Sequence, residues 1–400
     1  MPTTPSTAGA RSAGRRRALL RTARDVADDL AADAIARDQA GRPPTDERAR
    51  LREAGLLASL TPPGPDRGAD WRTGCAVIRE VAAADSSVGA VLARHYVHAW
   101  SGRFYASHHH ATALEEASVD EQWLWTGAIR TPAADGGIDG PDLTLRPRTA
   151  GHVLDGRRSV DTAVAVADQI VVDAVCVVTG DVLVVRIPLG ARGVSVEPAR
   201  DRLGQRVAGA GEVVLDRVAV APGQVLGRRP DDDESTAPFT ALAEPALRLA
   251  LCHVALGIAE GALTEARDLS RGGHAHRLPG EDPDLFLTYG ELASAAHTAT
   301  AVVDRATDVM AQALDTGAHL DPEEPAAVAA LVATAETVTS KAALHITTRV
   351  LELADAPGLD RFWRNARVLT AHRPAAHRLR SIGEHYLNGS QRTVGAAAFH

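Results

Sequence analysis

The feature that most constrains the fold is a change of hydrophobic period that occurs twice along the 400 residues. From about residue 19 to 125 apolar side chains recur every three to four positions, as in Val77 and Val81, and this spacing indicates helices. The next hundred residues are rich in Val, Gly, Asp and Thr, with runs such as Val182–Val185 that favour strands. Helical spacing returns over residues 241–353, with breaks expected near Gly272-Gly273, near Pro279-Gly280 and between Asp315 and Pro325.

This order predicts an α+β fold in three parts. The expected organisation is a flexible tail over residues 1–17, an N-terminal helical domain over 18–126, a central antiparallel β-domain over 127–228, and a C-terminal helical bundle with its tail over 229–400. Within the first domain, Asp85-Ser86-Ser87 are expected to cap a helix through their short oxygen side chains.

Composition points to a small-molecule partner in the cytoplasm. The formal net charge of -8 is modest and spread along the chain, so it favours no nucleic-acid or membrane partner. No run approaches the roughly 18 apolar residues of a membrane span. The three cysteines are widely spaced and odd in number, which argues against a disulfide framework. The His108-His109-His110 run is interpreted as a solvated helix face with no metal, because consecutive helical side chains diverge.

Several phrases, in this order and spacing, resemble the acyl-CoA dehydrogenase superfamily across nearly the whole chain. They are LREAGL from Leu51, IREVAAADSSVG from Ile78, GHVLDGRRS from Gly151, LGQR from Leu203, and the stretch Val214–Gly227. The resemblance implies the acyl-CoA dehydrogenase fold: an N-terminal helical domain, a central antiparallel β-domain and a C-terminal four-helix bundle.

The C-terminal segment is similar to the dibenzothiophene monooxygenase branch of that superfamily, through LDRFWRNARVLTAHRP over Leu359–Pro374 and the later Leu387-Asn388-Gly389. This resemblance implies a cytoplasmic two-component flavin-dependent monooxygenase, assembled as a homotetramer or dimer. It would take reduced FMN, or FAD, from a separate flavin reductase. With O2 it would form a C4a-hydroperoxyflavin and oxygenate sulfur, nitrogen or aromatic carbon of a small organic substrate.

The alternative is an FAD-dependent acyl-CoA dehydrogenase, which needs a carboxylate to remove a proton next to a thioester carbonyl. The two positions where the family places that acid correspond here to residues 371–374 and to Leu247, and neither holds one. Glu244, one helical turn earlier, is the remaining candidate base. A non-catalytic member of the fold is the third hypothesis. Because no Gly-x-Gly-x-x-Gly fingerprint follows a strand, the reductant is expected to come from outside.

The resemblance implies two sets of site residues. The candidate catalytic residues are His95, Thr162 and His372, whose hydroxyl or ring nitrogens could hold a peroxide in a dry pocket. The candidate cofactor-binding residues are Thr126, Gly127, Thr162, Arg271, Arg364, Asn365 and His372, with Arg271 acting across a subunit boundary.

Each of these residues also has a purely structural alternative. His95 could be a satisfied core histidine, Thr162 an ordinary strand threonine, and His372 a polar helix terminus. Arg364 and its neighbours Arg361 and Trp363 could instead pack a subunit interface.

Overall fold

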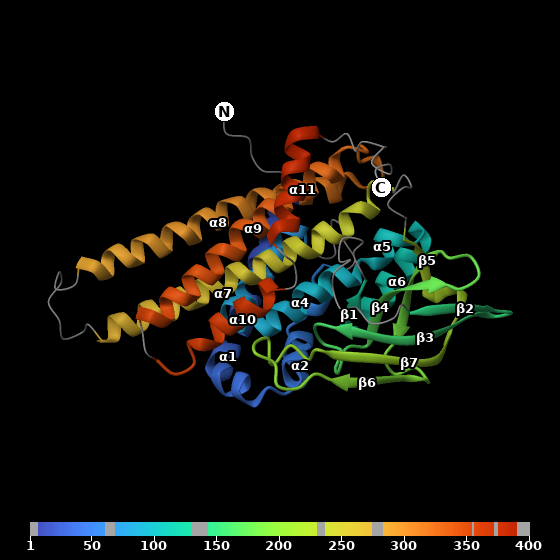
Figure 1. The fold of residues 1–400 in the computed structure, drawn as a ribbon, viewed down its shortest axis with the longest axis horizontal. Coiled ribbons are helices and arrows are strands. Elements are labelled where there is room, and N and C mark those ends of the chain that lie inside the picture. The colour runs from blue at the N-terminus through green and yellow to red at the C-terminus, as the bar shows by residue number, and fades with distance from the viewer. Residues whose placement is uncertain are drawn as a thin grey trace, which may run out of the picture.

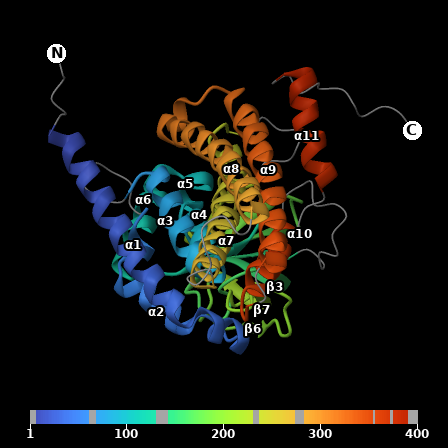
Figure 2. The same ribbon diagram turned by 90° about the vertical axis from the view of Figure 1, so that its left-hand side faces the viewer.

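The computed structural model describes residues 7–60, 69–129, 143–229, 237–273, 283–353, 356–371 and 375–389. Its three parts follow the predicted order: short helices, a sheet, and long helices. Figure 1 shows the long helices α7, α8 and α9 running side by side, with the sheet at one end of the molecule. Figure 2 looks from the left-hand side of that view and shows α1 and α11 on opposite flanks.

The N-terminal part begins earlier than predicted. Its elements are α1 (Thr7–Ala40), α2 (Thr45–Glu53), η1 (Leu56–Ala58), α3 (Trp71–Ala84), α4 (Ser86–Ala99), α5 (Ser101–Tyr105) and α6 (His108–Asp120). The expectation of a flexible tail over residues 1–17 is therefore wrong from Thr7 onward. The physical reason is that this stretch is rich in alanine and arginine, which are strong helix formers, and it continues directly into the apolar positions of α1.

The predicted cap at the start of α4 is confirmed. The Asp85 carboxylate accepts hydrogen bonds from the backbone N–H groups of Ser87 at 2.9 Å and Val88 at 3.2 Å. These bonds satisfy amide donors that have no partner within the first helical turn.

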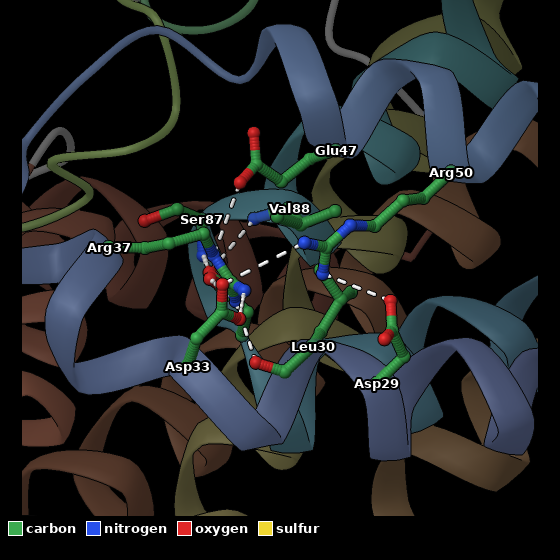
Figure 3. Close-up of polar contacts among 9 residues, drawn as sticks. Asp29, Leu30, Asp33, Arg37, Glu47, Arg50, Ser87 and Val88 are labelled. Carbon is green, nitrogen blue, oxygen red and sulfur yellow. Dashed lines mark hydrogen bonds and ion pairs between the residues drawn. The ribbon is translucent and has the colours of Figure 1, made fainter.

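The same carboxylate is held from the other side by Arg37 of α1. The Arg37 guanidinium lies 2.7 Å from Asp85, 3.2 Å from Glu47 of α2, and donates to the Leu30 carbonyl at 2.8 Å. Figure 3 shows Arg37 at the centre of this group, with Asp33 as a further partner. One buried arginine thus joins α1 and α2 to the beginning of α4, and α4 in turn carries site residues.

The central part is a mixed sheet. Its strands are β1 (Trp125–Ala128), β2 (Thr144–Arg148), β3 (Gly151–Val160), β4 (Gln169–Cys176), β5 (Val182–Pro188), β6 (Val194–Pro198), β7 (Gly211–Val220) and β8 (Val225–Arg228), the last preceded by η3 (Pro222–Gln224). Their order is β6-β7-β3-β2-β4-β5-β8, with β1 also paired to β4.

The prediction of a purely antiparallel domain starting at residue 127 needs two corrections. β1 and β2 both pair parallel to β4, while the other described pairings are antiparallel. The first strand also begins two residues earlier, at Trp125, which is fully buried. Strand propensity does not reveal direction, because parallel pairing is set by the crossover that brings β1 back beside β4.

The C-terminal part begins with η4 (Thr240–Leu242) and continues with α7 (Ala243–Gly273), α8 (Pro283–Thr316), η5 (Gly317–His319), α9 (Glu324–Leu353), α10 (Asp360–Ala371) and α11 (Ala375–Asn388). The predicted breaks fall at the ends of α7 and α8, as expected. In the described residues the bundle consists of three long helices, with the shorter α10 packed against α7 and α9, and α11 packed against α9.

Two stretches, Thr240–Gly272 and Glu324–Leu353, are long and apolar enough to cross a membrane by length and composition alone. In this structure they are core helices that pack on each other. Their apolar windows are 67% and 50% buried inside the protein. The main core joins these helices to α3 and α4, while a second cluster fills the sheet.

Candidate active site

A small cavity lies where α4, α7 and α10 meet the loops that follow β3 and β6. Its polar lining consists of Arg94, Asp161, Thr162, Arg202 and Gln205, and apolar side chains of the three helices complete it. We call it the Thr162 cavity. In the single chain it has room for about one water molecule, so a larger ligand must displace side chains to bind.

Thr162 is placed in this cavity with a free hydroxyl. The residue is only 3% exposed, and within the described structure its Oγ1 has no hydrogen-bond partner. Its backbone carbonyl accepts a 2.7 Å hydrogen bond from the hydroxyl of Thr126, which is fully buried in β1. Thr126 therefore fixes the backbone of Thr162. A buried hydroxyl without a partner costs about 1–3 kcal/mol, a cost that a hydrogen-bonding ligand would remove.

His95 is close to the cavity in sequence but does not line it. The ring is fully buried; Nε2 lies 2.7 Å from the Leu57 carbonyl oxygen, and Nδ1 accepts from the Trp125 N–H at 3.1 Å. Burial lowers the pKa of His95 to about 4, so the ring is neutral, with Nε2 as its donor. Both nitrogens are thus used in joining η1 to β1. This geometry favours the structural alternative, in which His95 positions the strand that carries Thr126.

The side of α4 that faces the cavity carries other residues. Ala90 and Arg94, spaced i and i+4, line it together. Further along the same face His98 packs on Gly127, where an added Cβ would lie 2.5 Å from the imidazole Cε1. Gly127 therefore accommodates a histidine ring. Burial, followed by the nearby Arg94 charge, lowers the pKa of His98 to about 3, and its buried Nε2 has no hydrogen-bond partner within the described structure.

Arg364 and Asn365, predicted to bind the cofactor, hold the turn that carries Gln205. Asn365 Oδ1 accepts from the Gln205 N–H at 2.6 Å, and Arg364 donates to the Leu203 carbonyl at 3.0 Å. Between them, a Cβ on Gly204 would lie 2.3 Å from the Arg364 carbonyl oxygen, so this close approach requires glycine. Two stretches quoted for the family resemblance, LGQR and WRNAR, are therefore packed directly against each other.

These contacts from Arg364 and Asn365, which we call the clamp, hold the Gln205 backbone in an unusual conformation. Its φ is 53°, in the left-handed region that side chains other than glycine rarely adopt. The residue is 4% exposed and its Oε1 is buried with no hydrogen-bond partner in the described structure. Its amide nitrogen makes only a long 3.4 Å contact to the Ser86 hydroxyl. Backbone strain combined with an unsatisfied polar group in a cavity is typical of a ligand-binding position.

The two remaining predicted residues, Arg271 and His372, are not among the described residues that line the cavity. Arg271 is exposed at the C-terminal end of α7, 20 residues after Leu251, which lines the cavity. At 1.5 Å per residue this separation is about 30 Å, so Arg271 cannot reach the cavity of its own chain. His372 lies outside the described residues.

Comparison with known proteins bears on what this cavity does. Residues 249–376 match the family model described as acyl-CoA dehydrogenase, C-terminal domain. The chain is 30% identical over 389 residues to the dibenzothiophene monooxygenase of Rhodococcus erythropolis, with 92% of each chain covered. The chain belongs to the dibenzothiophene monooxygenase family.

Two other members of known or assigned activity are similarly close. A probable FMNH2-dependent monooxygenase, SfnC, of Pseudomonas putida is 29% identical and covers 93% of this chain and 95% of its own. The structure of methanesulfinate monooxygenase MsuC from Pseudomonas fluorescens superposes with a TM-score of 0.83 at 29% identity, covering 92% of this chain and 96% of its own. The prediction of a flavin-dependent monooxygenase on the acyl-CoA dehydrogenase fold is confirmed.

Neither position that the family uses for the dehydrogenase base holds an acid in this chain, and the carboxylate in the cavity lining, Asp161, is paired with Arg94. Leu247 occupies one of the two expected positions and is half-buried on α7. Glu244 lies 4.0 Å from Arg248, whose guanidinium also pairs with Glu336 at 2.6 Å. Glu244 is two helical turns, about 10 Å, from Leu251 and is not part of the cavity lining.

Three residues of the cavity region were missed by sequence reasoning: Arg94, His98 and Gln205. The first two could have been found from the helical period, since they are four apart on α4 and Arg94 is turned by about 100° from His95. Gln205 carries no such signal, because its backbone conformation depends on a helix about 160 residues later in the chain.

Proposed function

We propose that this chain oxygenates a small organosulfur compound with O2 and reduced FMN, which a separate flavin reductase supplies. The similarity to a dibenzothiophene monooxygenase, a methanesulfinate monooxygenase and an FMNH2-dependent monooxygenase supports this proposal. The observation that carries it is the Thr162 cavity: a small space with an unused hydroxyl, whose single described carboxylate, Asp161, is paired with Arg94. Such a space suits oxygen transfer, which requires donors and the exclusion of water.

The residues present fit a flavin ring in their chemistry. The unpartnered groups of Thr162 and Gln205 supply a donor and an acceptor of the kind that the polar edge of an isoalloxazine needs. When bound, reduced FMN would supply the two electrons that activate O2. We assign Thr162 as the hydrogen-bond donor nearest the reaction and Thr126 as the residue that orients it. His95 is assigned to position β1 beneath them.

Arg271 and His372 remain proposals of a different kind. Arg271 could contact FMN only in an assembly where the end of α7 reaches the cavity of a second copy, so its role requires an oligomer such as the expected homotetramer. His372 lies outside the described residues, and its catalytic role stays a prediction of the family resemblance.

The test separates oxygenation from dehydrogenation. The purified chain is supplied with FMN, NADH, a flavin reductase and 18O2, with dibenzothiophene or methanesulfinate as substrate. We expect one labelled oxygen atom in the product. Anaerobic bleaching of the bound flavin by an acyl-CoA, with no labelled product under 18O2, would instead support the dehydrogenase. A flavin titration with no binding at micromolar concentration would support the non-catalytic alternative.

A second measurement tests the assignment of Thr162. Thr162→Ser keeps the hydroxyl, whereas Thr162→Val keeps the shape and removes it. We expect Thr162→Val to lower turnover at least tenfold, since a hydrogen bond made in the transition state is worth about 1.5 kcal/mol or more. Thr162→Ser should retain most of the activity. Equal activities for the two variants would contradict the assignment.

A further inference from the structure

The lining of the Thr162 cavity carries an excess of positive charge. Arg94 and Arg202 both line it, and Asp161 is the one carboxylate among its described lining residues. Asp161 pairs with Arg94 at 2.6 Å. Arg202 is half-buried, and among the described residues no carboxylate lies within the 4.0 Å of an ion pair with it. Burial lowers the pKa of Arg202, an effect that nearby Asp161 partly offsets.

The ion pair between Arg94 and Asp161 is unequal in its exposure. The Arg94 side chain is 11% exposed and its buried Nε makes no hydrogen bond within the described structure. The Asp161 side chain is 42% exposed, and it belongs to the loop after β3. The carboxylate is therefore the more solvated member of the pair, whereas the guanidinium is enclosed by the cavity. A buried cation with a partly solvated partner is able to exchange that partner for another anion.

From this geometry we propose that the substrate carries a small anionic group, such as a sulfinate or carboxylate, which displaces Asp161 and binds Arg94. Two oxygens of such a group match the fork of a guanidinium. The Thr162 hydroxyl lies in the same cavity as a further donor, and Arg202 supplies the second positive charge. In the free protein Asp161 occupies the position that the anion of the substrate would take. Its carboxylate neutralises Arg94, so the small cavity can contain a buried positive charge without a bound ligand. The inference rests on the proposed function for the reaction, but it concerns binding alone.

The experiment compares a matched pair of ligands on the full-length protein with FMN bound. Methanesulfinate carries the charge, and dimethyl sulfoxide is a neutral molecule of nearly the same shape. Dissociation constants are measured by calorimetry for the wild type, Arg94→Gln and Asp161→Asn. Arg217→Gln is the control, because that arginine is 83% exposed on β7.

The two variants are expected to change affinity in opposite directions. Arg94→Gln should weaken methanesulfinate binding at least tenfold, the value of one lost hydrogen bond between charged groups. Asp161→Asn should strengthen it about threefold, because the competing carboxylate is partly solvated. Dimethyl sulfoxide binding and the Arg217→Gln control should be unchanged. A general disturbance of the cavity would weaken binding in both variants and for both ligands, and that result would overturn the proposal.

A second arm distinguishes the substrate from the phosphate of FMN as the source of the anion. FMN and riboflavin, which lacks the phosphate, are titrated against the wild type and Arg94→Gln. If Arg94→Gln weakens FMN but not riboflavin, with methanesulfinate unaffected, Arg94 serves the cofactor and the proposal is wrong. Binding with the predicted charge pattern but no oxygenated product would keep this inference and reject the proposed function. If dibenzothiophene is oxygenated but neither variant changes the affinity for methanesulfinate, the proposed function is kept and this inference is rejected.

Discussion

Replacing Gln205 with glycine should leave the protein as stable as before while weakening what binds in the cavity. The left-handed backbone of Gln205, with φ of 53°, costs about 1–2 kcal/mol for a residue with a Cβ. Glycine removes that cost but adds about 0.5–1 kcal/mol of unfolded-state entropy. The Asn365 bond to the backbone N–H survives the change. The net effect on the free energy of unfolding is therefore a gain of about 0.5 kcal/mol.

Loss of the Gln205 side chain should change ligand affinity and leave the stability of the free protein nearly unchanged. The Oε1 has no partner in the described part of the protein, and the amide nitrogen makes only the long 3.4 Å hydrogen bond to the Ser86 hydroxyl, so loss of the side chain removes little internal hydrogen bonding. If the amide contacts FMN or substrate, one lost hydrogen bond of about 1 kcal/mol raises the dissociation constant about fivefold. FMN affinity is read from flavin fluorescence, substrate affinity from KM, and stability from urea unfolding followed by tryptophan fluorescence.

A matched control exists on the surface. Arg217 also has a positive φ, of 49°, and its side chain is 83% exposed. Arg217→Gly should show a similar small gain in stability with no change in FMN affinity or KM. If Gln205→Gly instead loses 2 kcal/mol or more while Arg217→Gly does not, the Gln205 side chain holds the free protein together. That result would refute the inference that the Gln205 side chain serves ligand binding.

Three further predictions concern the frame around the cavity. Gly204→Ala should lower the free energy of unfolding by about 1–3 kcal/mol in urea, because its Cβ would meet the Arg364 carbonyl oxygen at 2.3 Å; an unchanged midpoint would contradict the clamp. Arg37→Met should cost about 3–5 kcal/mol in the same assay, since it leaves buried carboxylates without their partner. Burial lowers the pKa of His95 to about 4 and that of His253 to about 3, below the 6.5 of an exposed histidine. The unfolded chain therefore binds protons at a higher pH than the folded chain does. The free energy of unfolding should fall as the pH decreases from about 6.5 towards 4. His253→Leu should remove part of this loss, and an unchanged pH slope would show that His253 is not buried in the neutral form.

The hydrophobic periodicity of the sequence was sufficient to predict the order of the three parts, because helices and strands differ in the spacing of their apolar residues. The cap at Asp85 and the breaks between the long helices were also predictable, since both depend on residues adjacent in sequence. The mixed sheet was not, as parallel pairing of β1 with β4 is decided by the path between them. The helix that begins at Thr7 was also missed. It depends on helix propensity, and the arginine-rich composition of this stretch was interpreted as that of a flexible tail.

The sequence predicted some of the residues in and around the Thr162 cavity and missed others. Thr162 lies in the cavity with a free hydroxyl, and Thr126 supports it. His95 was chosen because a histidine at that point of the family pattern suggested a donor. A shift of one residue on a helix turns a side chain by about 100°, so Arg94 lines the cavity while His95 enters the core. Asn365 acts on the cavity through Gln205, a relation that only the folded chain reveals.

The cavity wall has consequences for how the protein acquires activity. Its polar and apolar lining runs from Ala90 on α4 to Leu369 on α10, a separation of 279 residues (369 − 90). Contacts so distant in sequence form late, after the loop-closure entropy of the intervening chain has been lost. A nascent chain or a fragment ending before α10 therefore lacks the cavity, however well its sheet has folded. Retained flavin affinity would then report completion of the whole molecule, and variants that fold slowly could be sorted by flavin fluorescence alone.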